Sequence, residues 1–298
     1  MDQRSVINHR YVGRFAPSPT GPLHFGSLVT ALASYLDARA NGGKWLVRVE
    51  DLDPPREVTG SAALILEQLR ALGMDWDGGD ILYQSTRLSA YESILEQLEH
   101  RKICFHCDCS RQRVSSLEGI YDGRCRSRGL TSAPGLAIRL KIRPETIRFT
   151  DGIQGDYAQN LEHEVGDFIL RRKDGLFAYQ LAVVADDAEQ EITHIVRGYD
   201  LLSSTPRQIY LQQLLGLPTP RYAHIPIIVD ALGHKLSKQH FAEPIDLKNA
   251  SSLLISALQF LGMTPPPSLI GAAPISLVTW GVEHWDIQRV PKLAKMTR

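Results

Sequence analysis

The stretch Arg14-Phe15-Ala16-Pro17-Ser18-Pro19-Thr20-Gly21-Pro22-Leu23-His24-Phe25-Gly26-Ser27 decides how this chain is interpreted. Its prolines lack an amide donor, which predicts a rigid loop that delivers an imidazole and small residues to the start of a helix. Unpaired amides at a helix N-terminus suit a triphosphate, and Gly26 would let it approach the backbone. His24 would donate hydrogen bonds to phosphate oxygens. On chemistry alone, an ordinary loop in which His24 is a chance polar residue remains open.

The segments around this loop predict a nucleotide-binding α/β unit. Residues 11–15 are typical of a short strand, and the apolar residues between positions 28 and 36 recur at helical spacing. Gly42-Gly43 closes that helix, and residues 44–50 then alternate as a strand does. The order strand, loop, helix, strand is the opening of such a unit.

Composition excludes several classes of protein. The 298 residues include 33 basic and 33 acidic ones, so the net charge does not indicate a nucleic-acid binder. Hydrophobic residues make up 43%, as in ordinary globular proteins, and apolar runs are too short for a membrane span. The first eleven residues lack the apolar stretch of a secretory signal. We therefore expect a cytoplasmic, monomeric protein without membrane contact.

The remaining chain alternates helical and strand-like segments, and these are interrupted by a region of different composition. From residue 103 to about 164 it carries the cysteines, many arginines and short strand-like pieces, which indicates an insertion. Periodicity elsewhere predicts helices at 59–72, 85–102 and 251–261, and strands at 177–184, 192–196 and 224–229.

The cysteines form the clearest metal signal. All four, Cys104, Cys107, Cys109 and Cys125, lie within 22 residues, which favours metal ligation over a disulfide framework. Cys107, Cys109 and Cys125 would supply three soft ligands, whereas a structural zinc site takes four. Chemistry alone favours Cys104 as the fourth, with His106 and Tyr121 as further candidates. Reduced thiols without a metal are the alternative.

Two motifs resemble those of class I aminoacyl-tRNA synthetases. The quoted loop resembles their HIGH signature as glutamyl and glutaminyl enzymes write it, with Ser27 in place of the final histidine. Lys235-Leu236-Ser237-Lys238 resembles their KMSKS loop, with Gln239 replacing the last serine. The resemblance implies that His24 and Lys238 are catalytic and that ATP is bound by His24, Gly26, Ser27, Lys235 and Lys238.

Further segments resemble glutamyl-tRNA synthetases and imply an amino-acid pocket. They are Arg48-Val49-Glu50-Asp51-Leu52-Asp53-Pro54 and residues 177–182 and 192–208. Arg14 and Arg197 should hold the two carboxylates of L-glutamate, and Glu50 should accept from its ammonium group. Without the family, Arg197 would be a surface cation paired with Asp200. The implied glutamate site consists of Arg14, Phe15, Ala16, Pro17, Ser18, Glu50, Tyr179 and Arg197.

The same resemblance implies the cofactors and the domains. Some enzymes of the glutamyl type use the pattern Cys-x-Cys…Tyr-x-x-x-Cys, which implies a structural Zn²⁺ held by Cys107, Cys109, Tyr121 and Cys125. Mg²⁺ is expected with ATP. The expected fold is the Rossmann-like α/β catalytic domain of class I synthetases in two halves, a zinc-containing α/β insertion and a short helical C-terminal module that contacts the stem. The two halves of the catalytic domain are expected at 1–102 and 176–230, the insertion at 103–175 and the C-terminal module, with the KMSKS-like loop, at 231–298.

Full-length glutamyl-tRNA synthetases continue into a helical domain that reads the anticodon, and we expect none here because the resemblance stops in the mid-290s. With the cysteine pattern, this resembles a truncated branch that attaches glutamate to the queuosine of tRNA(Asp). The expected partners are therefore ATP, L-glutamate and queuosine-containing tRNA(Asp). The alternatives are transfer to the 3′ end of a tRNA and a non-catalytic RNA-binding paralogue.

Overall fold

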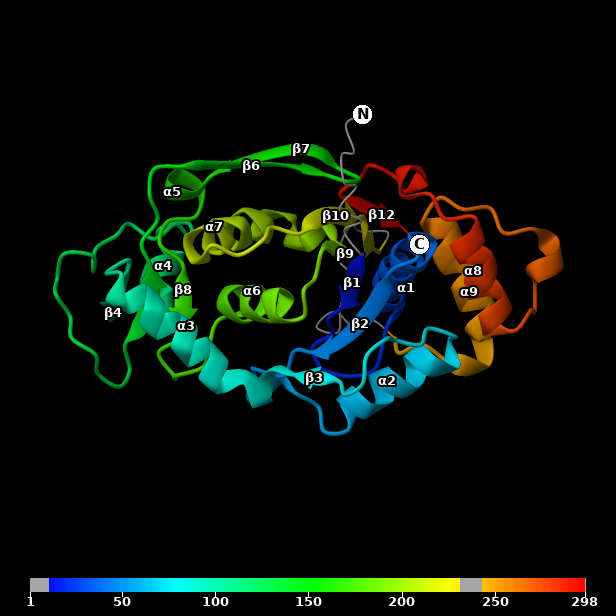
Figure 1. Ribbon diagram of the computed structural model, residues 1–298, viewed down its shortest axis with the longest axis horizontal. Helices are drawn as coiled ribbons and strands as arrows, with labels where there is room; N and C mark the ends of the chain where they lie inside the picture. The colour runs from blue at the N-terminus through cyan, green and yellow to red at the C-terminus, as the bar shows by residue number, and fades with distance from the viewer. Residues whose placement is uncertain (1–10, 231–242, 298) are drawn as a thin grey trace, which may run out of the picture.

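The computed structural model describes residues 11–230 and 243–297, and parallel strands form the centre of the molecule (Figure 1). The first sheet has the order β1-β2-β3, and a second pairs β9 with β10. The Thr193 amide donates to the Val12 carbonyl at 2.9 Å, which places β9 beside β1. The strands are β1 (Val12–Phe15), β2 (Lys44–Val49), β3 (Leu82–Tyr83), β9 (His194–Gly198) and β10 (Arg221–Ile225).

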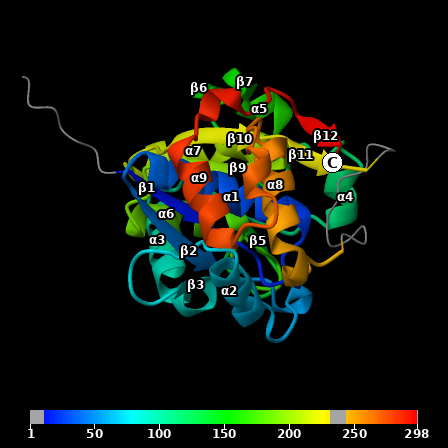
Figure 2. The same ribbon diagram turned by 90° about the vertical axis from the view of Figure 1, so that its right-hand side faces the viewer.

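The helix after the quoted loop begins where the sequence predicts. Helix α1 (Phe25–Ala40) starts after His24 and packs its fully buried Leu28, Leu32 and Leu36 into the core. Helices α8 (Ala250–Phe260) and α9 (Pro274–Glu283) cover α1 from outside, as Figure 2 shows. A Cβ on Gly281 would lie 3.0 Å from Leu36 and 3.1 Å from Leu258, so a larger residue at this position would force these leucines to shift.

Other helices surround the central strands. They are α2 (Ser61–Ala71), α3 (Leu88–His100), α6 (Tyr179–Glu189) and α7 (Thr205–Leu215). The predictions of helices at 59–72, 85–102 and 251–261 are thus confirmed, except that the first turn of the second is a separate 3₁₀ turn, Gln84–Arg87. None of the helices in the described part of the chain has the length and apolar character needed to cross a bilayer.

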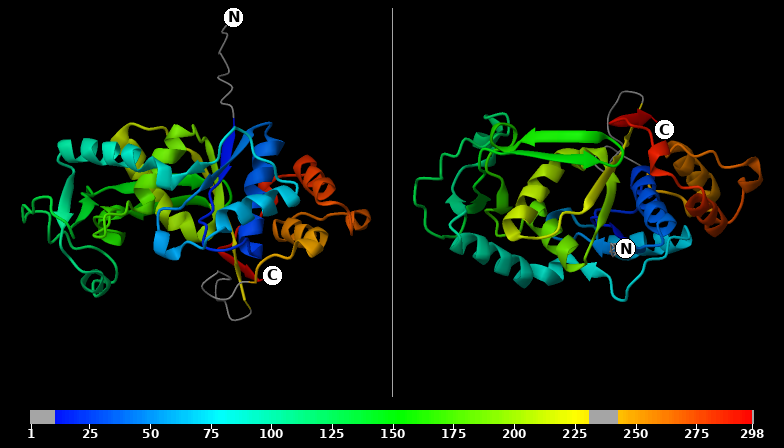
Figure 3. Two further views of the ribbon diagram at one scale, coloured as in Figure 1. Left: turned by 90° about the horizontal axis from the view of Figure 1, so that it is seen from below. Right: turned by 45° about the horizontal axis from the view of Figure 1, so that its top comes forward.

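Residues after α3 form a separate antiparallel region at one end of the molecule (Figures 1 and 3). Its sheet has the order β4-β5-β8, and a β6–β7 hairpin runs from it over α7 toward β10. The predicted insertion, residues 103–175, includes these elements. Its elements are β4 (Cys104–Cys107), α4 (Arg111–Ser115), β5 (Ala137–Leu140), β6 (Thr146–Asp151), β7 (Gly155–Asn160), α5 (Leu161–Glu164) and β8 (Ile169–Arg171).

Two strand predictions need correction. Residues 177–184 do not form a strand, because α6 begins at Tyr179. Short apolar runs do not distinguish a buried strand from a buried helix, and this helix is buried on nearly all sides. The predicted strand at 224–229 is divided at Pro226, which lacks an amide donor. β11 (Ile227–Val229) follows the break and pairs with β12 (Lys295–Thr297) near the C-terminus.

Candidate active site

A cleft of about 990 Å³ opens at the carboxyl ends of β1, β2 and β9. This is the position at which open parallel sheets bind ligands. Every described residue of the predicted glutamate and ATP sites lines it: Arg14, Phe15, Ala16, Pro17, Ser18, His24, Gly26, Ser27, Glu50, Tyr179 and Arg197. Lys235 and Lys238 lie outside the described residues.

The start of α1 is held by a reciprocal cap between His24 and Ser27. The Ser27 amide donates to His24 Nδ1 at 3.3 Å, and the His24 amide donates to Ser27 Oγ at 2.8 Å. A neutral ring whose Nδ1 accepts carries its proton on Nε2. That Nε2–H is the type of donor that a phosphate oxygen needs. Ser27, predicted as an ATP ligand, also closes the helix end, a role that its spacing of three residues from His24 could have revealed.

One side of the cleft contains a buried network of alternating charges. Arg14 Nε lies 3.2 Å from Asp187 Oδ1, and Arg48 Nη1 lies 2.8 Å from the same oxygen. Arg48 Nη2 is 3.3 Å from Glu50 Oε1. Because Arg48 is fully buried and Arg14 is 4% exposed, each guanidinium requires a nearby carboxylate.

The pKa values of the two carboxylates in this network are shifted in opposite directions. Burial would raise the pKa of Asp187, but Arg14 and Arg48 hold it below the usual value. Burial also raises the pKa of Glu50, and there Arg48 and Arg14 only partly oppose the effect. Glu50 is therefore the acid of this network whose ionised form gains most from an additional cation, such as an α-ammonium group.

Arg197 lines the same cleft but lies among neutral groups. Its Nη2 donates to Thr205 Oγ1 at 2.8 Å, its Nε to His224 Nε2 at 3.0 Å, and its Nη1 lies 3.5 Å from Tyr179 Oη. The ion pairs within residues 11–230 and 243–297 include none with Arg197. At 3% exposure it is buried, so the interpretation as a surface cation is wrong.

The sequence analysis missed three members of these networks. Arg48 stood inside a quoted motif without a role, Asp187 lay between two quoted segments, and His224 was noted only as the start of a strand. Arg48 and His224 are each polar within a run of apolar residues, a pattern that indicates a buried and partnered group. The pattern does not identify the partner.

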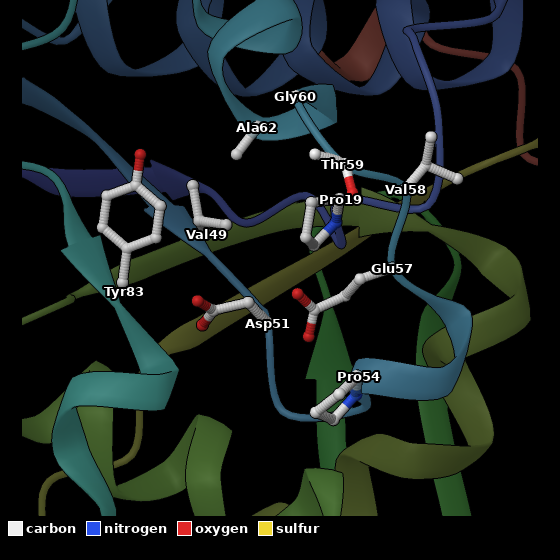
Figure 4. A pocket seen from close by; sticks show the side chains of 10 residues that line it. All are labelled: Pro19, Val49, Asp51, Pro54, Glu57, Val58, Thr59, Gly60, Ala62 and Tyr83. Atoms are coloured by element: carbon white, nitrogen blue, oxygen red, sulfur yellow. The ribbon is translucent and has the colours of Figure 1, made fainter.

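A second pocket, of about 340 Å³, lies behind the loop that follows β2. Figure 4 shows the Glu57 side chain pointing toward Asp51, below Pro19, while the Asp51 carboxylate points away from Glu57, to the side on which Tyr83 lies. Asp51 also accepts from the amide and hydroxyl of Ser85, at 2.8 and 2.6 Å. Burial and the neighbouring Asp51 raise the pKa of Glu57.

The cysteine cluster lies in the insertion. The Sγ atoms of Cys107, Cys109 and Cys125 lie within 4.8 Å of one another and are buried. Cys109 Sγ is 3.6 Å from Cys125 Sγ, and Tyr121 Oη is 3.5 and 3.8 Å from Cys107 and Cys109. Ligands at about 2.3 Å from a tetrahedral zinc ion would be roughly 3.7 Å apart. The three thiols are free rather than paired, and their arrangement could hold a metal ion.

The other two candidates for a fourth ligand face away from this cluster. Alternate side chains of a strand point to opposite faces, so Cys104 and His106 of β4 lie opposite Cys107. His106 Nε2 is 3.7 Å from Glu99, and burial with the nearby Glu99 raises the pKa of Cys104 to about 12. Cys104, which chemistry alone favoured, is therefore outside the set of converging donors.

An arginine accompanies each cysteine of the cluster. Arg139 Nε lies 3.3 Å from Cys107 Sγ. Arg113 Nη1 is 3.6 Å from Cys109 Sγ, and Arg128 Nη1 is 3.5 Å from Cys125 Sγ. Guanidinium groups at these distances stabilise thiolates, the form in which cysteine binds metals.

Comparison with known proteins establishes the family. Residues 11–268 match the family of tRNA synthetases class I (E and Q), catalytic domain. The chain therefore belongs to this family of class I tRNA synthetases, as its two motifs indicated.

Two relatives share the name glutamyl-Q tRNA(Asp) synthetase. The one from Ectopseudomonas mendocina is 51% identical over 286 residues, and the one from Pseudomonas aeruginosa is 53% identical over 286 residues. Each alignment covers 96% of this chain and 97% of the relative. A glutamate tRNA ligase from Elizabethkingia meningosepticum in complex with its amino acid superimposes with a TM-score of 0.77 at 27% identity. That match covers 96% of this chain and 66% of the longer ligase.

Proposed function

We propose that this chain activates L-glutamate with ATP and transfers it to the queuosine base of tRNA(Asp). The observation that carries the proposal is the likeness over nearly the full length of relatives that bear this name. The lining of the cleft supports it, because the cations Arg14 and Arg197 and the carboxylate Glu50 match the charges of glutamate.

The activation step is assigned as follows. A carboxylate oxygen of glutamate attacks the α-phosphorus of ATP, and pyrophosphate leaves. His24, through Nε2–H, and the start of α1 face the phosphates, together with Gly26 and Ser27. Lys235 and Lys238 neutralise the leaving pyrophosphate, and Mg²⁺ reduces the charge of ATP. A hydroxyl of queuosine then attacks the carbonyl carbon of the mixed anhydride, which forms the ester and releases AMP and the hydroxyl proton.

Within the pocket, the two sides take different parts of the amino acid. Glu50 accepts from the α-ammonium group, while Arg14 and Arg197 contact the carboxylates and Tyr179 and Ser18 complete the wall. Glutamine would leave Arg197 without an anionic partner in a buried site, so glutamate is preferred. Phe15, Ala16 and Pro17 shape the floor through their backbone.

The insertion is assigned a structural zinc ion held by Cys107, Cys109, Tyr121 and Cys125. Three thiolates and a phenol around a divalent cation leave no open position for reactive water. The bounds 103–175 for the insertion, 1–102 and 176–230 for the catalytic halves and 231–298 for a C-terminal module that contacts the stem belong to the same proposal.

The test is to label tRNA with radioactive glutamate and map the labelled nucleotide. Two preparations of tRNA(Asp) are compared, one containing queuosine and one lacking it. We expect label only with queuosine, and nuclease digestion should place it on that nucleotide. Label on tRNA that lacks queuosine, or at the 3′ end, would replace the proposed acceptor. Absence of glutamate-dependent ATP–pyrophosphate exchange would indicate a non-catalytic RNA-binding protein.

A further inference from the structure

We propose that Asp151 and His224 are positioning residues that fix Arg197 for the carboxylate of the amino acid. The inference rests on the proposed function, since it treats Arg197 as a glutamate contact. It adds two residues that touch no substrate, one of which comes from the β6–β7 hairpin of the insertion.

The His224 ring lies between Asp151 and Arg197 and forms a hydrogen bond with each of them. It is fully buried in β10, with Nδ1 2.5 Å from Asp151 Oδ2 and Nε2 3.0 Å from Arg197 Nε. Because the Nε of arginine always carries a hydrogen, Nε2 of the histidine must accept. The ring proton is then on Nδ1, where it donates to Asp151. Burial lowers the pKa of His224 to about 4, so near neutral pH this tautomer persists.

The contact determines the plane of the Arg197 guanidinium. Nε is held by His224, and Nη2 by Thr205 Oγ1 at 2.8 Å and the Leu201 carbonyl at 3.4 Å. Nη1 lies on the side of Tyr179, which lines the cleft. An arginine held along one edge presents the other edge to an incoming carboxylate with little rotamer entropy to lose.

Asp151 is a fully used acceptor at the tip of the hairpin. Its Oδ1 accepts amides from Ile153 at 3.0 Å, Gln154 at 2.9 Å and His224 at 3.0 Å. The Gln154 side chain in turn donates to the His224 carbonyl at 2.7 Å and to the Leu293 carbonyl at 3.2 Å. The hairpin therefore holds both the backbone and the ring of the histidine.

This arrangement connects the insertion to the amino-acid pocket. Figure 1 shows the β6–β7 hairpin reaching over α7 toward β10, with its tip on the side away from β4. A hairpin needed only for folding would contribute equally to every step of the reaction. A hairpin that positions Arg197 would affect glutamate affinity selectively, because ATP is bound on the side of α1.

Two substitutions of one residue separate these possibilities. In His224→Asn, the amide lies near the position of Nδ1 and can still donate to Asp151, but nothing accepts from Arg197 Nε. In His224→Gln, the longer side chain can place an oxygen near the position of Nε2 and accept from Arg197. We expect His224→Asn to raise the KM for glutamate about 10- to 100-fold with KM for ATP changed by less than about threefold. His224→Gln should recover most of the loss.

The measurement is glutamate-dependent ATP–pyrophosphate exchange on the full chain, with KM determined for each substrate and the melting temperature recorded. Asp151→Asn should change KM in the same direction by a smaller factor. An equal loss in both His224 variants, or a parallel rise in KM for ATP, would overturn the positioning role. If wild-type protein exchanges but does not label queuosine, the proposed acceptor fails while the positioning of Arg197 is still decided by the variants. If wild-type protein shows no exchange with glutamate, both proposals fall.

Discussion

The buried arginines that line the cleft differ in whether a carboxylate of the protein pairs with them. Arg14 and Arg48 face Asp187 and Glu50, so positive and negative charges are nearly balanced before any ligand arrives. Arg197 is equally buried, but its contacts are a neutral histidine, a threonine and a tyrosine. A protein tolerates an uncompensated buried cation where a ligand will supply the missing charge. We therefore expect the balanced group to stabilise the fold in addition to contacting the amino acid through Arg14 and Glu50, and Arg197 to receive its anionic partner from a bound carboxylate.

The largest effect is expected from Arg197→Met, which keeps much of the volume and removes the charge. The bound carboxylate would lose a cation, so kcat/KM for glutamate in the exchange assay should fall roughly a thousandfold, or about 3–5 kcal/mol. The melting temperature should change little, because no carboxylate of the protein loses its partner.

The control for this substitution is Arg172→Met. Arg172 also lines the cleft, but it is 31% exposed and pairs with Asp53 and Asp174. Its replacement should reduce kcat/KM by no more than a few-fold, about 1 kcal/mol. Similar losses in the two variants would mean that the unbalanced charge of Arg197 has no special part in binding.

Asp187→Asn should mainly lower the stability of the fold, whereas Arg197→Met should mainly lower kcat/KM. It leaves Arg14 without its carboxylate and Arg48 with Glu50 alone, so the folded state should lose about 3 kcal/mol. For a chain of this size the melting temperature would fall by roughly 6 to 10 °C. Calorimetry checks this, with the half-exposed Asp174→Asn as a control expected to change stability by less than about 1 kcal/mol. An unchanged melting temperature in Asp187→Asn would remove the distinction between the balanced group and Arg197.

The pH dependence of kcat/KM for glutamate should follow Glu50. Its pKa is raised by burial, and only the ionised form supplies the negative charge that pairs with the ammonium group. As the pH falls through that pKa, Glu50 is protonated and kcat/KM should decline by about tenfold per pH unit. The raised pKa means that the decline begins at a higher pH than an exposed glutamate would give. A profile of Glu50→Gln that retains this acid limb would assign it to another group.

The sequence predicted the parts of this site that depend on local rules. The loop before α1 follows from prolines without donors, and α1 from the spacing of apolar residues. The roles of Arg14, Glu50 and Arg197 came from resemblance, and the cleft that contains them is consistent with it. The sequence could not show that Asp187 is the acid that pairs with the cleft arginines. Its neighbour Asp186 is also buried, but it accepts from the Tyr91 hydroxyl at 2.7 Å. No local pattern distinguishes the two acids.

Long-range pairings were also beyond sequence reasoning. Asp151 and His224 are 73 residues apart, and their contact depends on where the insertion hairpin lies relative to β10. The segment from 177 was assigned as a strand because its apolar run has no period that separates the two structures. Only the packing of α6 between other elements decides that it is a helix.

The smallest effect on glutamate activation is expected from the cysteine cluster. Its Cys107 ends β4, which lies at one end of the molecule, whereas β1 and β9 lie at its centre (Figure 1). Cys125→Ser should release the metal, because a hydroxyl is a much weaker ligand for zinc than a thiolate. Cys104→Ser is the matched control, as this thiol points away from the other three and should leave the metal content unchanged.

Elemental analysis measures the metal content, and the exchange assay measures activation in the same samples. Activation should remain within about twofold of wild type in Cys125→Ser, since the ion acts by ordering the insertion rather than by touching glutamate or ATP. A metal content that survives Cys125→Ser would reject this ligand. Loss of exchange in proportion to loss of metal would mean that the insertion supports the pocket through more than the hairpin contact of Asp151 with His224.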